Sequence, residues 1–143
     1  MPSVKDIMTK TVASINLNQT IFEAAELMSS KGISCVLVTD GEVPVGVVTE
    51  RDIVGRVVAK RKSLDLKVSV IMSSSLITID PDASLKEAAR LMSANRIRRL
   101  PVLKKNKLVG IISASDFVRN LGKKTLTEEI LDAMGRYPAE ASL

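Results

Sequence analysis

The sequence reads Val45-Gly46-Val47-Val48-Thr49-Glu50-Arg51-Asp52, and 64 residues later it reads Val109-Gly110-Ile111-Ile112-Ser113-Ala114-Ser115-Asp116. In both stretches an apolar run ends in a hydroxyl residue, with a carboxylate three positions further on. Extending the comparison outward gives a gapless match of Val4–Val57 onto Val68–Leu121. Self-similarity at a fixed spacing indicates a repeated structural unit. The sequence therefore predicts one unit built twice.

The first helix of each repeat is predicted by a capping box, in which a hydroxyl residue is followed three positions later by glutamate. These boxes are Thr20-x-x-Glu23 and Ser84-x-x-Glu87, and each opens an apolar stripe at i, i+3, i+4, i+7 spacing. The stripes are Ile21, Ala24, Ala25 and Met28 in the first repeat, and Leu85, Ala88, Ala89 and Met92 in the second. The methionines on these stripes are expected to fill the core.

Short apolar runs separated by polar turns predict a pair of strands after each first helix. The pairs are Cys35–Thr39 with Pro44–Thr49, and Arg99–Leu103 with Leu108–Ser113. A second helix is expected at about Glu50–Lys60 and about Ala114–Leu121, and a short strand near Val12–Ile15 and Leu76–Ile79 precedes each first helix. The fold class is therefore α/β (α+β), with β-α-β-β-α order in each repeat.

One repeat of about 55 residues would leave a sheet face exposed, so the two repeats are predicted to pack through their sheets as a pseudo-two-fold pair. The predicted boundaries are 2–60 for the first repeat, 61–67 for a polar linker, 68–121 for the second repeat and 122–143 for a tail. In the tail, the capping box Thr125-x-x-Glu128 and the apolar residues Leu126, Ile130 and Met134 predict a short helix.

The composition removes most catalytic chemistry. Apolar residues make up 45% of the 143 residues and charged residues 26%, which favours a folded soluble domain. Histidine is absent, so the commonest general base and metal ligand are missing. The single cysteine, Cys35, lies in an apolar run and reads as a small core residue. We therefore predict that the chain is not an enzyme and has no catalytic residues and no metal site.

The charge favours an anionic partner without identifying it. Net charge is +5 and the pI is about 9.5. Aromatic residues make up only 2%, which leaves little for stacking nucleic-acid bases. No apolar run approaches the roughly 20 residues that cross a bilayer, and Met1–Lys10 has no signal-peptide pattern. A cytoplasmic location without membrane association is expected.

Four motifs, in order and repeated at one spacing, carry a family resemblance. They are Asp6-Ile7-Met8-Thr9, Pro44–Asp52, Arg98-Arg99-Leu100-Pro101-Val102 and Val109–Asp116. Together they resemble a tandem pair of cystathionine beta-synthase (CBS) domains, a Bateman module, of the stand-alone prokaryotic or archaeal type. The resemblance implies a regulatory module that senses AMP, ADP, ATP or S-adenosylmethionine in clefts between the repeats. It also implies a homodimer and an unidentified regulated protein.

Carried over by position, the resemblance implies two ligand sites, each with residues from both repeats. In the first site, Asp52 would hold the ribose, Thr49 and Arg51 the sugar or phosphate, Arg98 the phosphate, and Val47 with the backbone at Ile77 the adenine. The matching residues of the second site are Asp116, Ser113, Ser115, Ser34, Ile111 and Ala13.

The second site departs from the basic pattern, because Ser34 and Cys35 stand where the other repeat has Arg98 and Arg99. We therefore expect the first site to bind phosphate better. A carboxylate can accept both hydrogen bonds of a ribose diol, and a helix beginning at Glu50 or Ala114 would offer N–H groups to an anion.

Other interpretations of the same residues stay open. Thr49-x-x-Asp52 and Ser113-x-x-Asp116 also have the spacing of helix caps. Gly46 and Gly110 would admit a ligand to the backbone or only ease a bend in the strand. The charge leaves a nucleic-acid-associated regulator as the alternative function, although the chain has no helix-turn-helix segment or zinc-finger spacing.

Overall fold

The computed structural model describes residues 2–120, so the helix predicted in the tail lies outside the described residues. The chain divides into two compact units. One is continuous, from Val12 to Leu76. Among the described residues, the other joins those up to Thr11 with those from Ile77 to Asn120.

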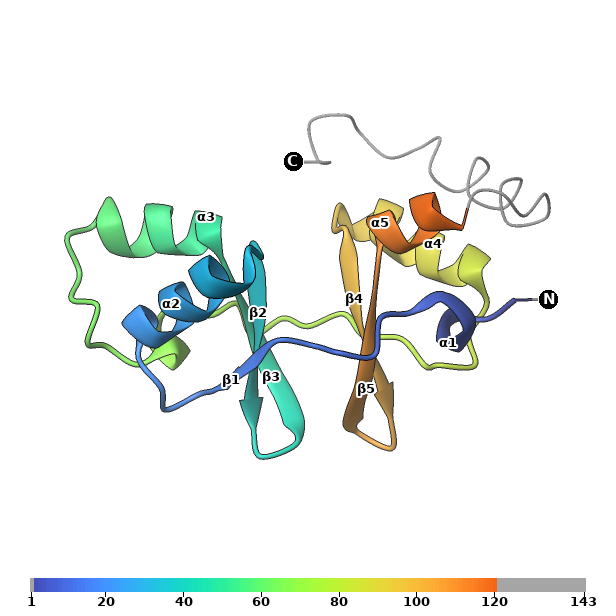
Figure 1. Cartoon of the computed structure of the whole chain (residues 1–143), viewed down its shortest axis with the longest axis horizontal. Helices are drawn as coiled ribbons and strands as arrows, with labels where there is room; N and C mark the ends of the chain where they lie inside the picture. Colours follow the sequence, from blue (N-terminus) through green and yellow to red (C-terminus); the bar gives the residue numbers. More distant parts are fainter. Residues whose placement is uncertain (1, 121–143) are drawn as a thin grey trace. The chain divides into compact units, whose positions relative to one another are not determined.

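The continuous unit is a three-stranded sheet with helices on one face (Figure 1). Its elements are β1 (Ser14–Asn16), α2 (Ile21–Lys31), β2 (Cys35–Asp40), β3 (Val43–Thr49) and α3 (Glu50–Asp52), followed by a π-helical segment Ile53–Val58 and a 3-10 turn Val68–Val70. The strand order is β1-β2-β3, with β1 parallel and β3 antiparallel to β2. The second helix predicted at Glu50–Lys60 is thus α-helical for only three residues and then continues as π-helix.

The discontinuous unit repeats this plan with a smaller sheet. Its elements are α1 (Val4–Ile7), α4 (Leu85–Asn95), β4 (Arg99–Lys104), β5 (Lys107–Ser113) and α5 (Ala114–Arg119). The β4–β5 hairpin is antiparallel, and its register shifts between Val102 and Leu103. The β2–β3 hairpin shifts at the matching place, between Val38 and Thr39. The two hairpins therefore share the same shift of register at equivalent positions.

The first helices begin at the predicted caps. The Thr20 hydroxyl accepts a hydrogen bond from the Glu23 N–H at 3.1 Å, and the Glu23 carboxylate accepts one from the Thr20 N–H at 3.3 Å. In α4 the Ser84 hydroxyl accepts from the Glu87 N–H at 3.0 Å. The methionines of both stripes, Met28 and Met92, are buried as predicted.

The segment that precedes each repeat pairs with the opposite repeat. Ser3 bridges Ser84, and 64 residues later Lys67 bridges Thr20. Leu66, in the predicted linker, accepts a hydrogen bond from the Ile21 N–H at 2.9 Å. This bond satisfies an amide at the start of α2 that has no partner within the helix. The linker is thus part of the folded unit rather than a tether.

The strand predicted at Leu76–Ile79 is wrong, because this segment makes only a single parallel bridge, from Ile79 to Val102. In the first repeat the Leu37 N–H donates to the Ala13 carbonyl at 3.1 Å. Pro101 stands at the position of Leu37 and has no N–H to donate to Ile77. The ladder that forms β1 is therefore cut short in the second repeat.

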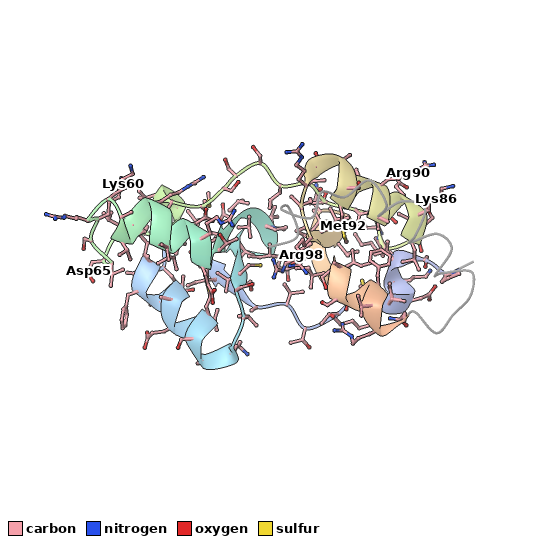
Figure 2. The ribbon with its side chains drawn as sticks, turned by 90° about the horizontal axis from the view of Figure 1, so that it is seen from above. Lys60, Asp65, Lys86, Arg90, Met92 and Arg98 are labelled. Carbon is pink, nitrogen blue, oxygen red and sulfur yellow. The ribbon has the colours of Figure 1, made fainter. Side chains whose placement is uncertain are left out.

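Each unit has its own core. The side chains of one are Val4, Ile7, Ile79, Leu85, Ala88, Ala89, Met92, Leu100, Val102, Ile112 and Phe117, and those of the other are Ile15, Ile21, Ala24, Met28, Val36, Val38, Val48, Val57, Val68 and Ile71. Met92 points into its unit while Arg90, on the same helix, points outward (Figure 2). Cys35 is only half-buried at the first position of β2, so its assignment to the core is corrected.

Candidate functional site

The two carboxylates predicted to bind ligand both lie where the last strand of a repeat turns into its second helix. Thr49 is the N-cap of α3, and its side chain accepts a hydrogen bond from the Asp52 N–H at 3.1 Å. The Asp52 carboxylate in turn accepts one from the Thr49 N–H at 2.9 Å. Ser113 and Asp116 form the equivalent capping box at α5. The capping interpretation is therefore correct at both positions.

Asp52 keeps much of its acceptor capacity. Its second oxygen faces the Arg56 Nε at 3.6 Å, and its side chain is 16% exposed. Arg56 also donates from Nη1 to the carbonyl of Ile71 at 3.0 Å. An ionised carboxylate has about four lone-pair sites. Only one of them takes a hydrogen bond from the residues that the structure describes.

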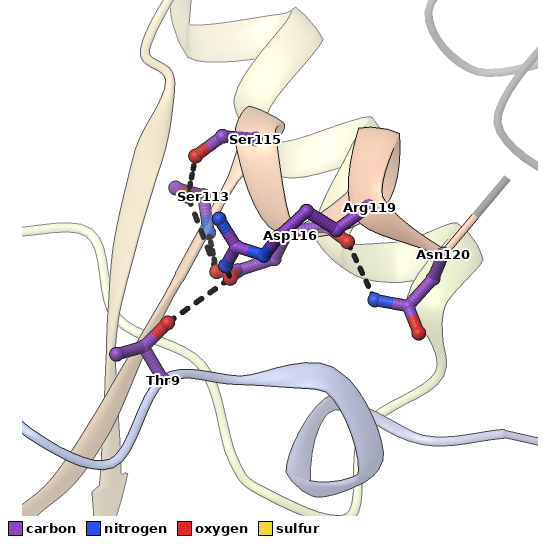
Figure 3. A network of polar contacts seen from close by, with 6 residues as sticks. All are labelled: Thr9, Ser113, Ser115, Asp116, Arg119 and Asn120. Carbon is purple, nitrogen blue, oxygen red and sulfur yellow. Dashed lines mark hydrogen bonds and ion pairs between the residues drawn. The ribbon is translucent and has the colours of Figure 1, made fainter.

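Asp116 is different, because it is fully buried and its oxygens are surrounded by donors (Figure 3). One oxygen accepts from the Thr9 hydroxyl at 3.0 Å and pairs with the Arg119 guanidinium. The other accepts from the Ser113 N–H at 2.8 Å and from the Ser113 hydroxyl at 3.1 Å. Four donors match the four lone-pair sites of the carboxylate. The Asp116 carboxylate is therefore satisfied by residues of its own unit.

The first N–H groups of the second helices are also occupied. The Glu50 N–H donates to the Ser34 carbonyl and the Ala114 N–H to the Arg98 carbonyl, both at 2.9 Å. These two first amides are therefore not free for an anion. The bonds tie each helix start to the beginning of the preceding strand pair.

Gly46 and Gly110 are each in close contact with another segment of the chain, so neither position is an open surface. A Cβ on Gly46 would lie 2.6 Å from the Met72 Sδ and 2.9 Å from the Ser73 carbonyl oxygen. A Cβ on Gly110 would lie 2.7 Å from the Met8 Sδ and 2.9 Å from the Thr9 carbonyl oxygen. Real Cβ atoms do not approach so closely. Glycine is therefore required where the segment that precedes each repeat crosses the last strand of the opposite repeat: Met72 and Ser73 cross β3 at Gly46, and Met8 and Thr9 cross β5 at Gly110. We call these two crossing segments the exchanged segments.

The remaining predicted residues lie around the same turns and strand ends. Val47, Ile111, Ser34, Ser113, Ala13, Ile77 and Arg98 are half-buried, whereas Arg51 and Ser115 are exposed. The Ser115 hydroxyl lies 2.8 Å from that of Ser113. Val47 pairs with Ser73, and Ile111 with Thr9, through reciprocal backbone bonds of 2.9 Å.

Arg98 and Ile77 each carry a polar group without a partner among residues 2–120. The half-buried guanidinium of Arg98 makes no hydrogen bond or ion pair there, and no donor reaches the carbonyl oxygen of Ile77. The carbonyl of Ala13, the counterpart of Ile77, accepts the Leu37 N–H. The repeats therefore differ in which polar groups remain open.

Three residues of these networks were missed from the sequence. Arg56 follows Asp52 by four positions and Arg119 follows Asp116 by three, and both spacings allow ion pairs on a helix. Those spacings were a usable signal. Thr9 carried none, because it reaches Asp116 across 107 residues.

Neither a metal site nor a membrane span is found in the part of the chain that the structure describes. Residues 2–120 hold no cluster of three or more His, Cys, Asp or Glu suited to a metal ion. No helix formed by these residues combines the length and apolar character needed to cross a bilayer.

The comparison with family models agrees with the internal repeat. The CBS domain model matches twice, over residues 4–59 and 68–123. The chain belongs to the CBS domain family. The paired motifs recognised in the sequence are therefore two CBS domains, and the mixed α/β fold is that of a CBS pair.

Curated and solved relatives extend this assignment. The CBS domain-containing protein YhcV of Bacillus subtilis is 42% identical over 120 residues, covering 84% of this chain and 86% of the relative. The CBS domain protein PAE2072 of Pyrobaculum aerophilum, complexed with AMP, is 27% identical with a TM-score of 0.79, covering 92% of this chain and 99% of that one. The CBS domain pair of protein MJ0100, in complex with 5'-methylthioadenosine and S-adenosyl-L-methionine, is 29% identical with a TM-score of 0.75, covering 85% and 97%.

Proposed function

We propose that this CBS pair is a regulatory module that binds an adenosine-type nucleotide, AMP, ADP, ATP or S-adenosylmethionine, and catalyses no reaction. The observation that carries the proposal is the half-buried Asp52 carboxylate, which has acceptor capacity to spare at the turn into α3. A ribose diol donates two hydrogen bonds, which such a carboxylate can accept together. The similarity to CBS proteins complexed with AMP or with S-adenosyl-L-methionine supports an adenosine ligand.

The residues proposed for the first site have complementary chemistry. Asp52 accepts the ribose hydroxyls, and Thr49 with Arg51 faces the sugar or phosphate. Val47 and the backbone at Ile77 flank the adenine, and Arg98 meets the phosphate. The half-buried guanidinium of Arg98 suits this role, because it makes no ion pair among the described residues and Arg binds phosphate with charge-assisted bonds.

Binding would act on a partner protein through the ligand's different affinity for two arrangements of the pair.

We also propose that the chain forms a homodimer and works in the cytoplasm. In support of self-association, Val54 and Val58 are 62% and 63% exposed one helical turn apart. Light scattering with and without ligand tests this, and a strict monomer in both states contradicts it.

The test of the nucleotide site is calorimetric titration of AMP into the wild type, Arg98→Ala and Ser34→Arg. Loss of one charge-assisted bond should weaken AMP binding by roughly ten- to a hundredfold. The loss should shrink at high salt, where the wild type also binds more weakly. Ser34→Arg supplies the missing arginine at the second position and serves as the matched variant. AMP binding that is unchanged in Arg98→Ala contradicts the phosphate role, and no heat with any of the four ligands contradicts the proposed function.

A further inference from the structure

We propose that Met8 and Met72 are a pair of oxidation sites, where a peroxide converts the thioether to a sulfoxide and so loosens the exchanged segments from β5 and β3. The two residues occupy the same position of the two repeats, 64 residues apart. Met8 and Gly110 belong to one compact unit, and Met72 and Gly46 belong to the other. Each contact therefore lies within a single unit, and the inference does not depend on the proposed nucleotide site.

Each sulfur atom fills the space that a side chain would take on the facing glycine. The Cβ position of Gly110 lies 2.7 Å from the Met8 Sδ, and that of Gly46 lies 2.6 Å from the Met72 Sδ. The carbonyl oxygen of the residue after each methionine is 2.9 Å from the same Cβ position. A sulfoxide oxygen only accepts hydrogen bonds, so this carbonyl oxygen cannot satisfy it. Oxidation therefore favours movement of the side chain away from the glycine and into solvent.

Met8 and Met72 differ in exposure from the two methionines on the first helices. Met28 on α2 is 4% exposed, and Met92 on α4 is 0% exposed. Met8 and Met72 are only half-buried, and each packs against the core of its unit. Because each keeps contact with solvent, a small oxidant can reach it without opening of the core. A peroxide should therefore react with these two residues before it reacts with Met28 or Met92.

The reaction balances with a peroxide as the only co-reactant. A lone pair of the thioether sulfur attacks one peroxide oxygen, the O–O bond breaks, and an S–O bond forms. With hydrogen peroxide, the second oxygen leaves as hydroxide and takes the proton of the transferred oxygen, which gives water. The sulfur loses two electrons and the peroxide gains them. Methionine sulfoxide reductases reverse the change, so the modification can act as a switch.

The backbone bonds beside each methionine should open first. Thr9, the residue after the first methionine, is joined to Ile111 by two hydrogen bonds of 2.9 Å. Ser73, the residue after the second, is joined to Val47 in the same way. A side chain that leaves the glycine no longer holds these bonds against the strand. Amide hydrogen exchange at these four residues should therefore become faster in the oxidised protein.

The first experiment measures which methionines react. The full chain carries Cys35→Ser, which removes the competing thiol, and is treated with hydrogen peroxide. Peptide mass spectrometry at early times should show that Met8 and Met72 gain one oxygen at least about tenfold faster than Met28 and Met92. Equal rates at the four residues would overturn the proposal.

The second experiment measures what the modification does to the protein. Once Met8 and Met72 have reacted, the Thr9 and Ser73 amides should exchange their hydrogens at least about tenfold faster. Tm should fall by at least about 4 °C, and methionine sulfoxide reductases should restore both values. Complete oxidation with unchanged Tm and unchanged amide exchange would overturn the proposal. A loss that the reductases do not reverse would overturn the assignment to methionine.

The third experiment compares two matched double variants, because leucine has a similar volume and cannot take up oxygen. Met8→Leu/Met72→Leu should keep its Tm in peroxide, whereas Met28→Leu/Met92→Leu should still respond as the wild type does. The opposite pattern would overturn the assignment. If the first double variant does not fold, the single variants Met8→Leu and Met72→Leu replace it. Each should lose the change in amide exchange at its own segment only, and a change that persists there would contradict the proposal.

Discussion

Asp52 and Asp116 occupy the same position of the repeat, yet Asp52 keeps unused acceptor capacity among the described residues, whereas Asp116 is buried and surrounded by donors. Both close a capping box, and both have a nearby arginine. The difference arises from three donors: the hydroxyls of Thr9 and Ser113 donate to Asp116, and Arg119 pairs with it directly, whereas Arg56 stays 3.6 Å from Asp52. Ser73, the counterpart of Thr9, makes no side-chain hydrogen bond among the described residues. A few donor contacts are thus enough to give two carboxylates at matching positions of a repeat different surroundings.

The largest effect should come from the buried carboxylate. Asp116→Asn places an amide N–H group against the donors that surround this buried position, which should lower the free energy of unfolding by about 2–3 kcal/mol. Asp52→Asn keeps an acceptor for the Thr49 N–H at a half-buried site and should cost under about 1 kcal/mol. Urea unfolding of both variants measures the contrast. Equal losses would mean that the two carboxylates contribute alike to stability.

The next effect concerns a feature that the units share. Gly110→Ala would force the Thr9 backbone and Met8 away from β5, and overpacking of this kind costs about 1–3 kcal/mol. Gly46→Ala should cost a similar amount, because Met72 and Ser73 crowd it in the same way. Gly55→Ala is the control, since a Cβ there meets nothing within 4 Å. Thermal unfolding that shows no loss for Gly46→Ala or Gly110→Ala would contradict the close crossing.

The smallest effect should appear at the first helices. Hydrogen bonds from the Gln19 side chain and the Thr20 backbone lower the pKa of the Glu23 carboxyl from its ordinary value. Its contribution to stability is therefore present above the ordinary carboxyl pKa and is lost as pH falls through the lowered value. Urea midpoints at about pH 6 and about pH 3 should drop more for the wild type than for Glu23→Gln, which does not titrate. If the urea midpoints of wild type and Glu23→Gln fall equally with pH, ionised Glu23 does not contribute to stability.

Much of the fold followed from the sequence because it depends on local periodicity. The capping boxes placed α2 and α4 correctly, and the paired apolar runs placed both hairpins within a residue or two. The shortened strand at Ile79 was missed, although Pro101 was visible and its lack of an N–H could have predicted it. The candidate residues came from a family pattern that treats the repeats alike. The burial of Asp116 depends on a contact across 107 residues, which no local spacing signals.

The pairing of each preceding segment with the opposite repeat also sets an order for folding during synthesis. The unit Val12–Leu76 is continuous, so its partners have all been made once Leu76 leaves the ribosome. The segment with Ser3 and Thr9 emerges earlier, yet its partners Ser84 and Ile111 are made much later. A chain released after Leu76 would therefore hold one finished unit and a leading segment that still lacks the strand it pairs with.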